Sequence, residues 1–358
     1  MKTRNIFLTV SVFAAVVAST AYVWRAPLSL AVAKRVAVNR MGADALGQLP
    51  DGLHIGLCGA GSPMPDDRRM GACTLVAAGK RLFVFDAGNG SARNIGKMDF
   101  VHGRIEAIFL THFHSDHIDG LGELLMQRWV STGNPAPVPL YGPPGVDKVV
   151  AGFMLAYAQD QHYRVAHHGE ATLPNSGFGA EAKPFAAPSE GHVVLISDAD
   201  LEISAFMVDH KPVHPAVGYR ITYKGRSVVL SGDTKKSAAV QREAAGVDLL
   251  LHEAMSTPMM SMLEQSANAA GRPNVKKLMA DIVDYHSSPE QAAEIARDAK
   301  VRYLLLNHIA PPLPLPGLEK AFLGDAANLY SGPIRVGVDG DFVSLPAGSA
   351  DVITSRRF

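Results

Sequence analysis

The sequence is poor in cysteine. Among its 358 residues only Cys58 and Cys73 are present, too few for a disulfide framework, and their spacing is not that of a zinc knuckle. They flank one glycine-rich turn, so a disulfide between them and two buried free thiols are both open. Any metal site in this chain is therefore expected to use histidine and aspartate.

An excess of one charge is also lacking. Lys and Arg number 34, as do Asp and Glu, so no global basic field attracts nucleic acid or an acidic membrane surface. Gly59 and Gly61 are not followed by GK[ST], which excludes a nucleotide-binding phosphate loop. What the chain has is apolar residues, 47% of the total, enough for a sizeable core in one large or two small domains.

The amino-terminal segment resembles a targeting sequence in composition. Lys2 and Arg4 precede an uncharged apolar run at 6–24, which is typical of an export signal. The run is also about long enough to span a bilayer, so a cleaved signal and an uncleaved anchor are both open. We therefore expect an extracytoplasmic protein, periplasmic or secreted, with a signal peptide or anchor at 1–24, a linker at 25–50 and one folded domain at 51–348.

Four potential metal ligands lie within six residues: His112, His114, Asp116 and His117. They follow an apolar run at 105–110 that predicts a buried strand. Alternate residues of an extended segment face the same way, so His112 and His114 can bind one ion. Asp116 and His117, one turn further, can face a second ion, and the spacing predicts two metals side by side.

Further candidate ligands follow later predicted strands, where α/β folds place their chemistry. These are His210 after 201–208, Asp233 after 227–230 and His308 after 303–306. His214 lies four residues after His210 and competes for the same role. His252 follows another apolar segment and is expected to pack behind the ligands.

The pattern HxHxDH at a strand end, followed by His, Asp and His in that order, resembles the metallo-β-lactamase superfamily of hydrolases. The phrases at 61–63, 218–220, 231–234, 252–254 and 286–288 resemble its ribonuclease Z and arylsulfatase-like branch, and the resemblance covers about residues 54–345. Tyr157 to Asp160 followed by Arg164 looks closer to the arylsulfatase-like members. The resemblance implies an α/β fold, the αββα metallo-β-lactamase sandwich, preceded here by the amino-terminal segment.

The resemblance also implies a site with two Zn²⁺ ions. One would be held by His112, His114 and His210, the other by Asp116, His117 and His308, with Asp233 as the bridge. Two zinc ions lower the pKa of a shared water, so that hydroxide can act as nucleophile near neutral pH. Asp116 is expected to be a catalytic residue as well as a metal ligand.

His286 is the expected general acid. Ser288, Pro289 and Gln291 predict a helix start of the capping-box type, which fixes His286 just before a rigid helix. A titratable side chain so mounted suits a proton donor, although an ordinary histidine beside a cap gives the same pattern. The resemblance gives this role to the histidine of an HST motif, which reads His-Ser-Ser here.

Local patterns predict the remaining elements. Strands are expected at 73–76 and 81–86, helices at 121–129 and 146–158, and a hairpin from 334–338 and 342–345. The stretch 160–190 is rich in glycine and proline and is expected to be an irregular loop. Its His167 and His168 are either substrate-binding residues or surface histidines.

We thus expect an exported dinuclear zinc hydrolase of small sulfate or phosphate esters. Nucleic acid is not expected as a partner, because the insert at 171–190 has Lys183 as its only cation and phosphate-backbone binding uses several. Membrane anchoring through 6–24 and a homodimer are left open. The alternatives are a ribonuclease Z-like endoribonuclease and an exported metal-binding protein without enzymatic activity.

Overall fold

The computed structural model describes residues 2–358, with side chains from residue 18 onward. Two compact units are formed, Met1–Asp44 and Ala45–Phe358. The first consists of helix α1, Lys2–Met41, which runs through the predicted boundary at residue 24. Most of the predicted signal peptide or anchor at 1–24 lies before residue 18, where side chains are not described. Within the residues that are described, no helix is long and apolar enough to cross a membrane.

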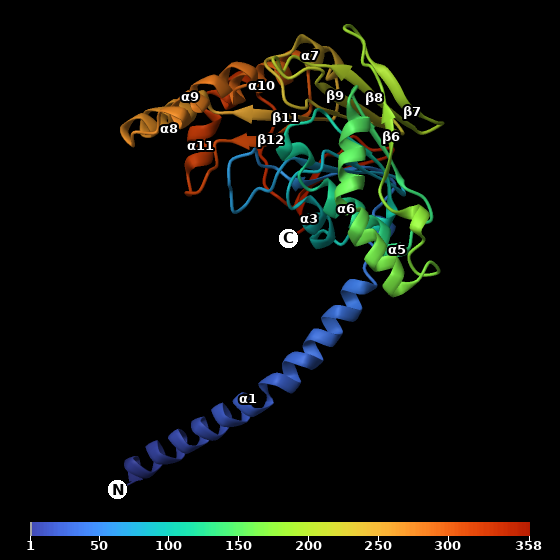
Figure 1. Ribbon diagram of the computed structural model, residues 1–358. Helices are drawn as coiled ribbons and strands as arrows, with labels where there is room; N and C mark the ends of the chain where they lie inside the picture. Colours follow the sequence, from blue (N-terminus) through green and yellow to red (C-terminus); the bar gives the residue numbers. More distant parts are fainter. Residues whose placement is uncertain (1) are drawn as a thin grey trace. The chain divides into compact units, whose positions relative to one another are not determined.

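The second unit contains two sheets (Figure 1). The eight-stranded sheet has the order β15-β14-β1-β2-β3-β4-β5-β6, and the seven-stranded sheet the order β13-β12-β11-β10-β9-β8-β7. The strands of the first sheet are β1 (Gly52–Gly59), β2 (Cys73–Ala78), β3 (Arg81–Phe85), β4 (Ile105–Phe109), β5 (Val138–Gly142), β6 (Ala180–Pro184), β14 (Asp341–Pro346) and β15 (Ile353–Arg356). Those of the second are β7 (Val193–Ser197), β8 (Leu201–Met207), β9 (Val217–Tyr223), β10 (Arg226–Leu230), β11 (Leu249–Met255), β12 (Tyr303–Ala310) and β13 (Ile334–Val336).

Helices cover the outer face of each sheet. On the first sheet lie α2 (Ala45–Gln48), α3 (Ser91–Lys97), α5 (Leu121–Thr132) and α6 (Val146–His168). On the second lie α7 (Ala238–Glu243), α10 (Pro289–Asp298), α11 (Leu318–Leu323) and α12 (Ala326–Leu329). The other helical segments are α4 (Ser115–Ile118), α8 (Thr257–Ala269), α9 (Pro273–Asp281), η1 (His102–Arg104), η2 (Asn175–Gly177) and η3 (Ile282–Tyr285).

Apolar side chains fill the space between the sheets. The rings of Phe85 and Phe109 stack with centroids 4.7 Å apart, and Tyr219 from the facing sheet meets Phe85 edge-on at 5.1 Å. Such a core forms because central strands read as nearly continuous apolar runs, which parallel strands buried on both faces require. With helices outside both sheets, the result is the predicted αββα sandwich.

The parallel strands set the position of the site. β3, β4 and β5 run parallel, as do β10, β11 and β12. Because parallel strands end at one edge of a sheet, the segments that leave β4, β10 and β12 come together. His112, His114 and Asp233 lie in the segments after β4 and β10, and His308 lies near the end of β12.

Cys58 on β1 and Cys73 on β2 form a disulfide, with Cα atoms 5.0 Å apart. Both residues are buried, at 0% and 1% exposure. Of the two alternatives that the sequence left open, the structure has the bonded one.

Two predictions about local structure are wrong. The expected hairpin does not form, because β13 pairs with β12 in one sheet while β14 pairs with β1 and β15 in the other. The expected loop at 160–190 begins as helix, since α6 continues to His168, and it later forms β6 beside β5.

Candidate metal centre

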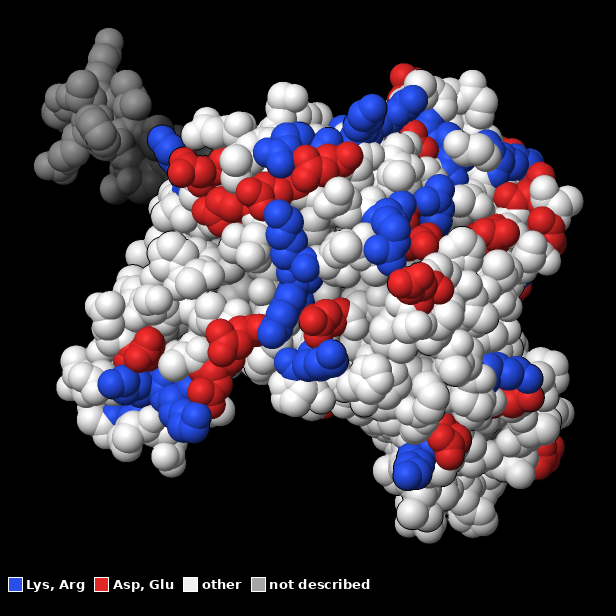
Figure 2. Space-filling model, turned by 90° about the horizontal axis from the view of Figure 1, so that it is seen from above, with Lys and Arg blue, Asp and Glu red and all other residues white. Residues whose placement is uncertain are grey.

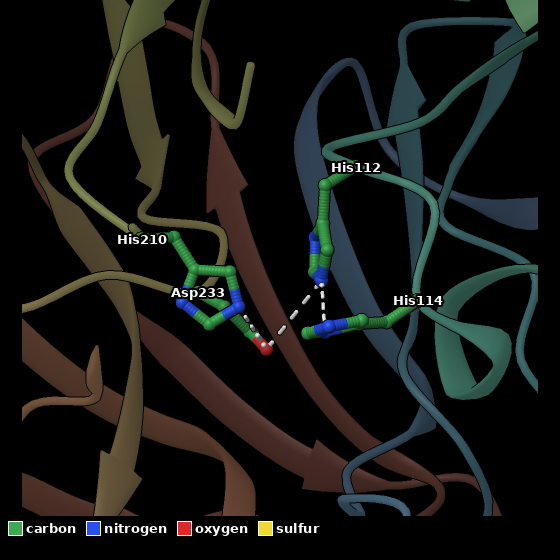
Figure 3. Close-up of side chains that lie close together, drawn as sticks. All are labelled: His112, His114, His210 and Asp233. Carbon is green, nitrogen blue, oxygen red and sulfur yellow. Dashed lines mark hydrogen bonds and ion pairs between the residues drawn. The ribbon is translucent and has the colours of Figure 1, made fainter. Parts of the chain in front are cut away.

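The first group of candidate ligands is His112, His114, His210 and Asp233, which converge from both sheets (Figure 3). His112 and His114 follow β4, and the Nε2 atom of His112 lies 3.0 Å from the Nδ1 atom of His114. His210 follows β8 and Asp233 follows β10. The Oδ2 atom of Asp233 lies 3.9 Å from the Nε2 atoms of both His112 and His210.

The second group is Asp116, His117 and His308. The Nε2 atom of His308 lies 3.0 Å from Oδ2 of Asp116, and the Nε2 atom of His117 lies 3.6 Å from the same oxygen. Both ring nitrogens are 3.3 Å from Oδ2 of Asp233. One carboxylate oxygen of Asp233 is thus close to both groups, the position that a bridging ligand requires.

The donor set fits metal ions. The buried Nε2 atom of His210 has no hydrogen-bond partner among the described residues, although buried polar atoms normally have one. Imidazole nitrogens and carboxylate oxygens are the ligands that zinc accepts in sites without cysteine. His and Asp clusters of this kind can hold metal, as the sequence predicted.

Residues behind the ligands fix the orientation of the rings. Asp86, at the end of β3, places its Oδ2 atom 2.8 Å from Nδ1 of His117 and accepts a hydrogen bond from the Thr111 hydroxyl at 2.9 Å. The Thr111 hydroxyl is 3.0 Å from Nδ1 of His112. Nδ1 of His210 lies 2.9 Å from the carbonyl oxygen of Tyr285. Partners of this kind fix the tautomer, leaving Nε2 of His112, His117 and His210 directed at the cluster.

The carboxylates and histidines shift one another's pKa values. Burial lowers the pKa of His112 well below its usual value. Burial also opposes charge on His117 and His308, but Asp233 and the neighbouring carboxylates outweigh it. They raise the pKa of His117 well above the usual value and that of His308 to about 9. His308 and His117 in turn hold the pKa of Asp233 well below its usual value, although burial raises it.

His308 reaches the cluster through an irregular strand. The register of β11 against β12 shifts between Glu253 and Ala254, and His308 itself has a φ of 47°. This left-handed conformation is uncommon for a residue with a Cβ, and irregularities of this kind often re-aim a side chain beside a functional site. The sequence predicted His308 just after a strand, whereas it lies within β12.

His286 stands beside the second group of ligands. Its ring centroid is 5.5 Å from that of His308, and its Nδ1 atom lies 3.1 Å from Oε1 of the buried Glu253. The same oxygen accepts a hydrogen bond from the backbone N–H of Ser287 at 2.9 Å. The predicted capping box is present at the start of α10, directly after this pair. Glu253 therefore orients His286, which leaves Nε2 for another partner.

Other histidines lie outside this cluster. His167 and His168 are exposed in the last turn of α6, and neither is among the residues that line the described cavities beside the cluster. His214 is exposed, whereas His252 is fully buried with Nδ1 2.7 Å from the Glu253 carbonyl oxygen.

Sequence reasoning missed Glu253 and Asp86. Glu253 lies in the stretch 252–254 and Asp86 at the end of the predicted strand 81–86. The role of a single carboxylate cannot be predicted until the residue that it contacts is known. The contacts with His286 and His117 supply those roles.

Comparison with known proteins agrees with this geometry. A family profile described as "Beta-lactamase superfamily domain" matches residues 81–309. The chain belongs to the metallo-β-lactamase superfamily. A protein named Ribonuclease Z from Mycolicibacterium gilvum (strain PYR-GCK) is 37% identical over 289 residues, covering 80% of this chain and 94% of that protein. Another Ribonuclease Z, from Mycobacterium avium (strain 104), is 36% identical over 300 residues, covering 83% and 100%.

Solved structures show the same superfamily fold. Human tRNase Z, short form, has a TM-score of 0.58 and 21% identity, with 82% of this chain and 99% of that chain covered. The metallo-β-lactamase fold protein YhfI from Bacillus subtilis has a TM-score of 0.57 and 17% identity, with 82% and 100% covered.

These relatives correct several expectations. The exported arylsulfatase-like hydrolase of small esters is wrong as the main interpretation, since the relatives that match most of the chain are named Ribonuclease Z. The same relatives overturn the expectation that nucleic acid is not a partner. They also overturn the expected export. No helix among the described residues is long and apolar enough to cross a membrane, and most of the segment at 6–24, through which anchoring was left open, has side chains outside the described part.

Proposed function

We propose that this protein is a metal-dependent endoribonuclease of the ribonuclease Z type, which hydrolyses a phosphodiester bond in a precursor tRNA. The observation that carries the proposal is the 37% identity to a Ribonuclease Z over 80% of this chain and 94% of the relative. The converging ligands and the oriented His286 support it, since they suit phosphodiester hydrolysis.

In this proposal two zinc ions are the cofactor. His112, His114 and His210 would hold one, Asp116, His117 and His308 would hold the other, and Asp233 would contribute to both. Such ions, when bound, lower the pKa of water and stabilise negative charge on phosphate oxygens. The chain supplies a closely spaced ligand cluster whose ring orientations are set by Asp86, Thr111 and the Tyr285 carbonyl.

His286 acts as the general acid. Hydrolysis adds a water oxygen to phosphorus, breaks one phosphorus–oxygen bond and leaves an alkoxide that needs a proton. Glu253 accepts from Nδ1 of His286, so Nε2 can donate a proton to the departing oxygen. The cavity that His286 lines is also lined by His114, Asp116, Asp233 and His308, so proton donor and cluster face the same space.

The test is a direct comparison of substrates on the metal-loaded protein. We expect cleavage of a precursor tRNA with a 3′ extension, and hydrolysis of bis(p-nitrophenyl) phosphate, a minimal phosphodiester. An aryl sulfate should be a poor substrate. Intact precursor tRNA at high enzyme concentration, with turnover of the small diester, would refute the proposal.

A further inference from the structure

The molecule has no extended basic surface on the face shown in Figure 2. Lys and Arg side chains alternate there with Asp and Glu over most of the charged area. An RNA substrate carries a negative charge at every nucleotide, and binding it requires local contacts to phosphates. Phosphate contacts must therefore come from cationic side chains close to the candidate metal centre.

Two lysines line a second cavity, which also includes His286. Lys235 and Lys236 follow Asp233 after one intervening residue, and the cavity they line also includes Ser288 and Gln291 from the start of α10. His286 belongs both to this cavity and to the one at the metal ligands, and it is the one residue common to their described linings. We call the cavity lined by Lys235 and Lys236 the lysine cavity.

The lysine cavity has the chemistry of a phosphate site. Lys235 is half-buried, and no ion pair in the described part of the chain joins it to a carboxylate. Lys236 is exposed, with Nζ 2.6 Å from Oε2 of Glu294, and Asp284 is an exposed carboxylate at the rim. The amino terminus of α10, a helix of 10 residues, adds partial positive charge.

A third cavity, also beside the metal ligands, is acidic. A cavity that shares Ser115 and Asp116 with the metal cavity is lined by Asp66, Asp67 and Asp119. Its cation, Arg69, is paired with Asp66 at 3.2 Å. Backbone phosphates are therefore favoured at the lysine cavity and disfavoured at this acidic cavity.

We propose that the lysine cavity binds the phosphate that neighbours the scissile one on the leaving-group side of an RNA substrate, with Lys235 as its main contact. This inference rests on the proposed function. His286 must touch the departing oxygen to protonate it, so the leaving nucleotide extends past His286, and the next phosphate arrives between Lys235, Lys236 and the start of α10. Recognition of a second phosphate gives the site a preference for polynucleotides over isolated diesters.

The test uses the full-length, metal-loaded protein with two substrates. A precursor tRNA has a phosphate on the leaving-group side, whereas bis(p-nitrophenyl) phosphate has none. For Lys235→Gln we expect the loss of kcat/KM on the RNA to exceed the loss on the small diester by about tenfold, mostly through KM. The slope of log(kcat/KM) against log[salt] on RNA should become shallower by about one, as for one lost phosphate contact.

Matched variants make the comparison specific. Lys300→Gln removes an exposed lysine before β12, at the end of that strand away from His308. It should change neither the ratio of kcat/KM on RNA to that on the small diester nor the slope of log(kcat/KM) against log[salt]. Lys235→Arg keeps the charge and should restore most of the preference for RNA. If Lys235→Gln does not fold by circular dichroism, Lys236→Gln provides the same comparison with a smaller expected effect.

The failures are distinguishable. Equal losses on both substrates, or no loss on either, would show that Lys235 does not bind a neighbouring phosphate, while cleavage of RNA by the unmodified protein would still uphold the proposed function. Hydrolysis of the small diester without any cleavage of RNA would overturn the proposed function and this inference together.

Discussion

At the scale of single residues, the contact between Glu253 and His286 favours proton donation over metal binding as the role of His286. Glu253 is fully buried, and one oxygen, Oε1, lies within hydrogen-bond distance of both the His286 ring and the Ser287 N–H. A carboxylate with fixed donors holds the ring in one orientation, as a positioned general acid needs. In this account Glu253 is a positioning residue and His286 is catalytic.

His286→Ala should lose activity according to the leaving group. A positioned acid contributes about a hundredfold to ten-thousandfold when a strong base departs, and far less when the leaving group is acidic. We expect the large loss on RNA or a phenyl ester and a small one on a nitrophenyl ester, with both metals retained by elemental analysis. Equal losses on all substrates, or loss of metal, would identify His286 as structural.

His308 leads to a prediction about protons. In the protein without metal, Asp233 and Asp116 raise the pKa of His308 to about 9 against the effect of burial, so its ring is protonated at pH 7. A metal ion requires the neutral ring, so binding at pH 7 must release protons, and metal affinity must increase as pH rises toward 9. Calorimetric titrations with zinc in buffers of different ionisation enthalpy measure the release directly. A binding heat that is the same in all buffers would contradict this.

At the scale of elements, the strands and their ligand-bearing ends were predictable because the information is local. The apolar run at 105–110 and the histidines after it are contiguous, and β4 ends at Phe109 as that pattern predicts. The hairpin at 334–345 failed because Asp339 and Gly340 form a turn signal without indicating a partner strand. In the structure Asp339 accepts hydrogen bonds from Ala60 and Met70, more than 260 residues away in sequence.

Helix α6 was predicted too short for a related reason. From residue 151 onward none of its residues is fully buried, so its second half lacks the apolar stripe by which a helix is recognised. An i,i+4 ion pair between Arg164 and Asp160, at 2.8 Å, is one local contact there. Contacts of this kind leave little trace in the hydrophobic pattern.

The disulfide between β1 and β2 should contribute to stability. It closes a loop with a sequence separation of 15, for which the chain-entropy model gives about 3 kcal/mol. We expect the double variant Cys58→Ala with Cys73→Ala to have a free energy of unfolding lower by about 3 kcal/mol. It should therefore unfold at a lower denaturant concentration, while its metal content is unchanged. The oxidised and reduced forms of the unmodified protein provide the control. Identical unfolding midpoints for all forms would contradict the prediction.

At the scale of the whole molecule, the sandwich and the candidate metal ligands all belong to the unit Ala45–Phe358. We propose that residues 45–358 fold and bind metal without residues 1–44. The truncated protein should match the full chain in melting temperature, metal content and hydrolysis of bis(p-nitrophenyl) phosphate. A lower melting temperature with lost activity would show that the first unit stabilises the second.

In the proposed function, Asp233 joins two metal sites into one centre that cleaves RNA. The most direct measurement follows cleavage of a 3′-extended precursor tRNA while zinc is added to metal-free protein, with bound zinc counted in parallel. We expect cleavage to reach its maximum at two zinc ions per chain, and we expect an Asp233→Ala variant to bind less zinc and to cleave no RNA. Full cleavage by the metal-free protein, or by Asp233→Ala, would contradict it.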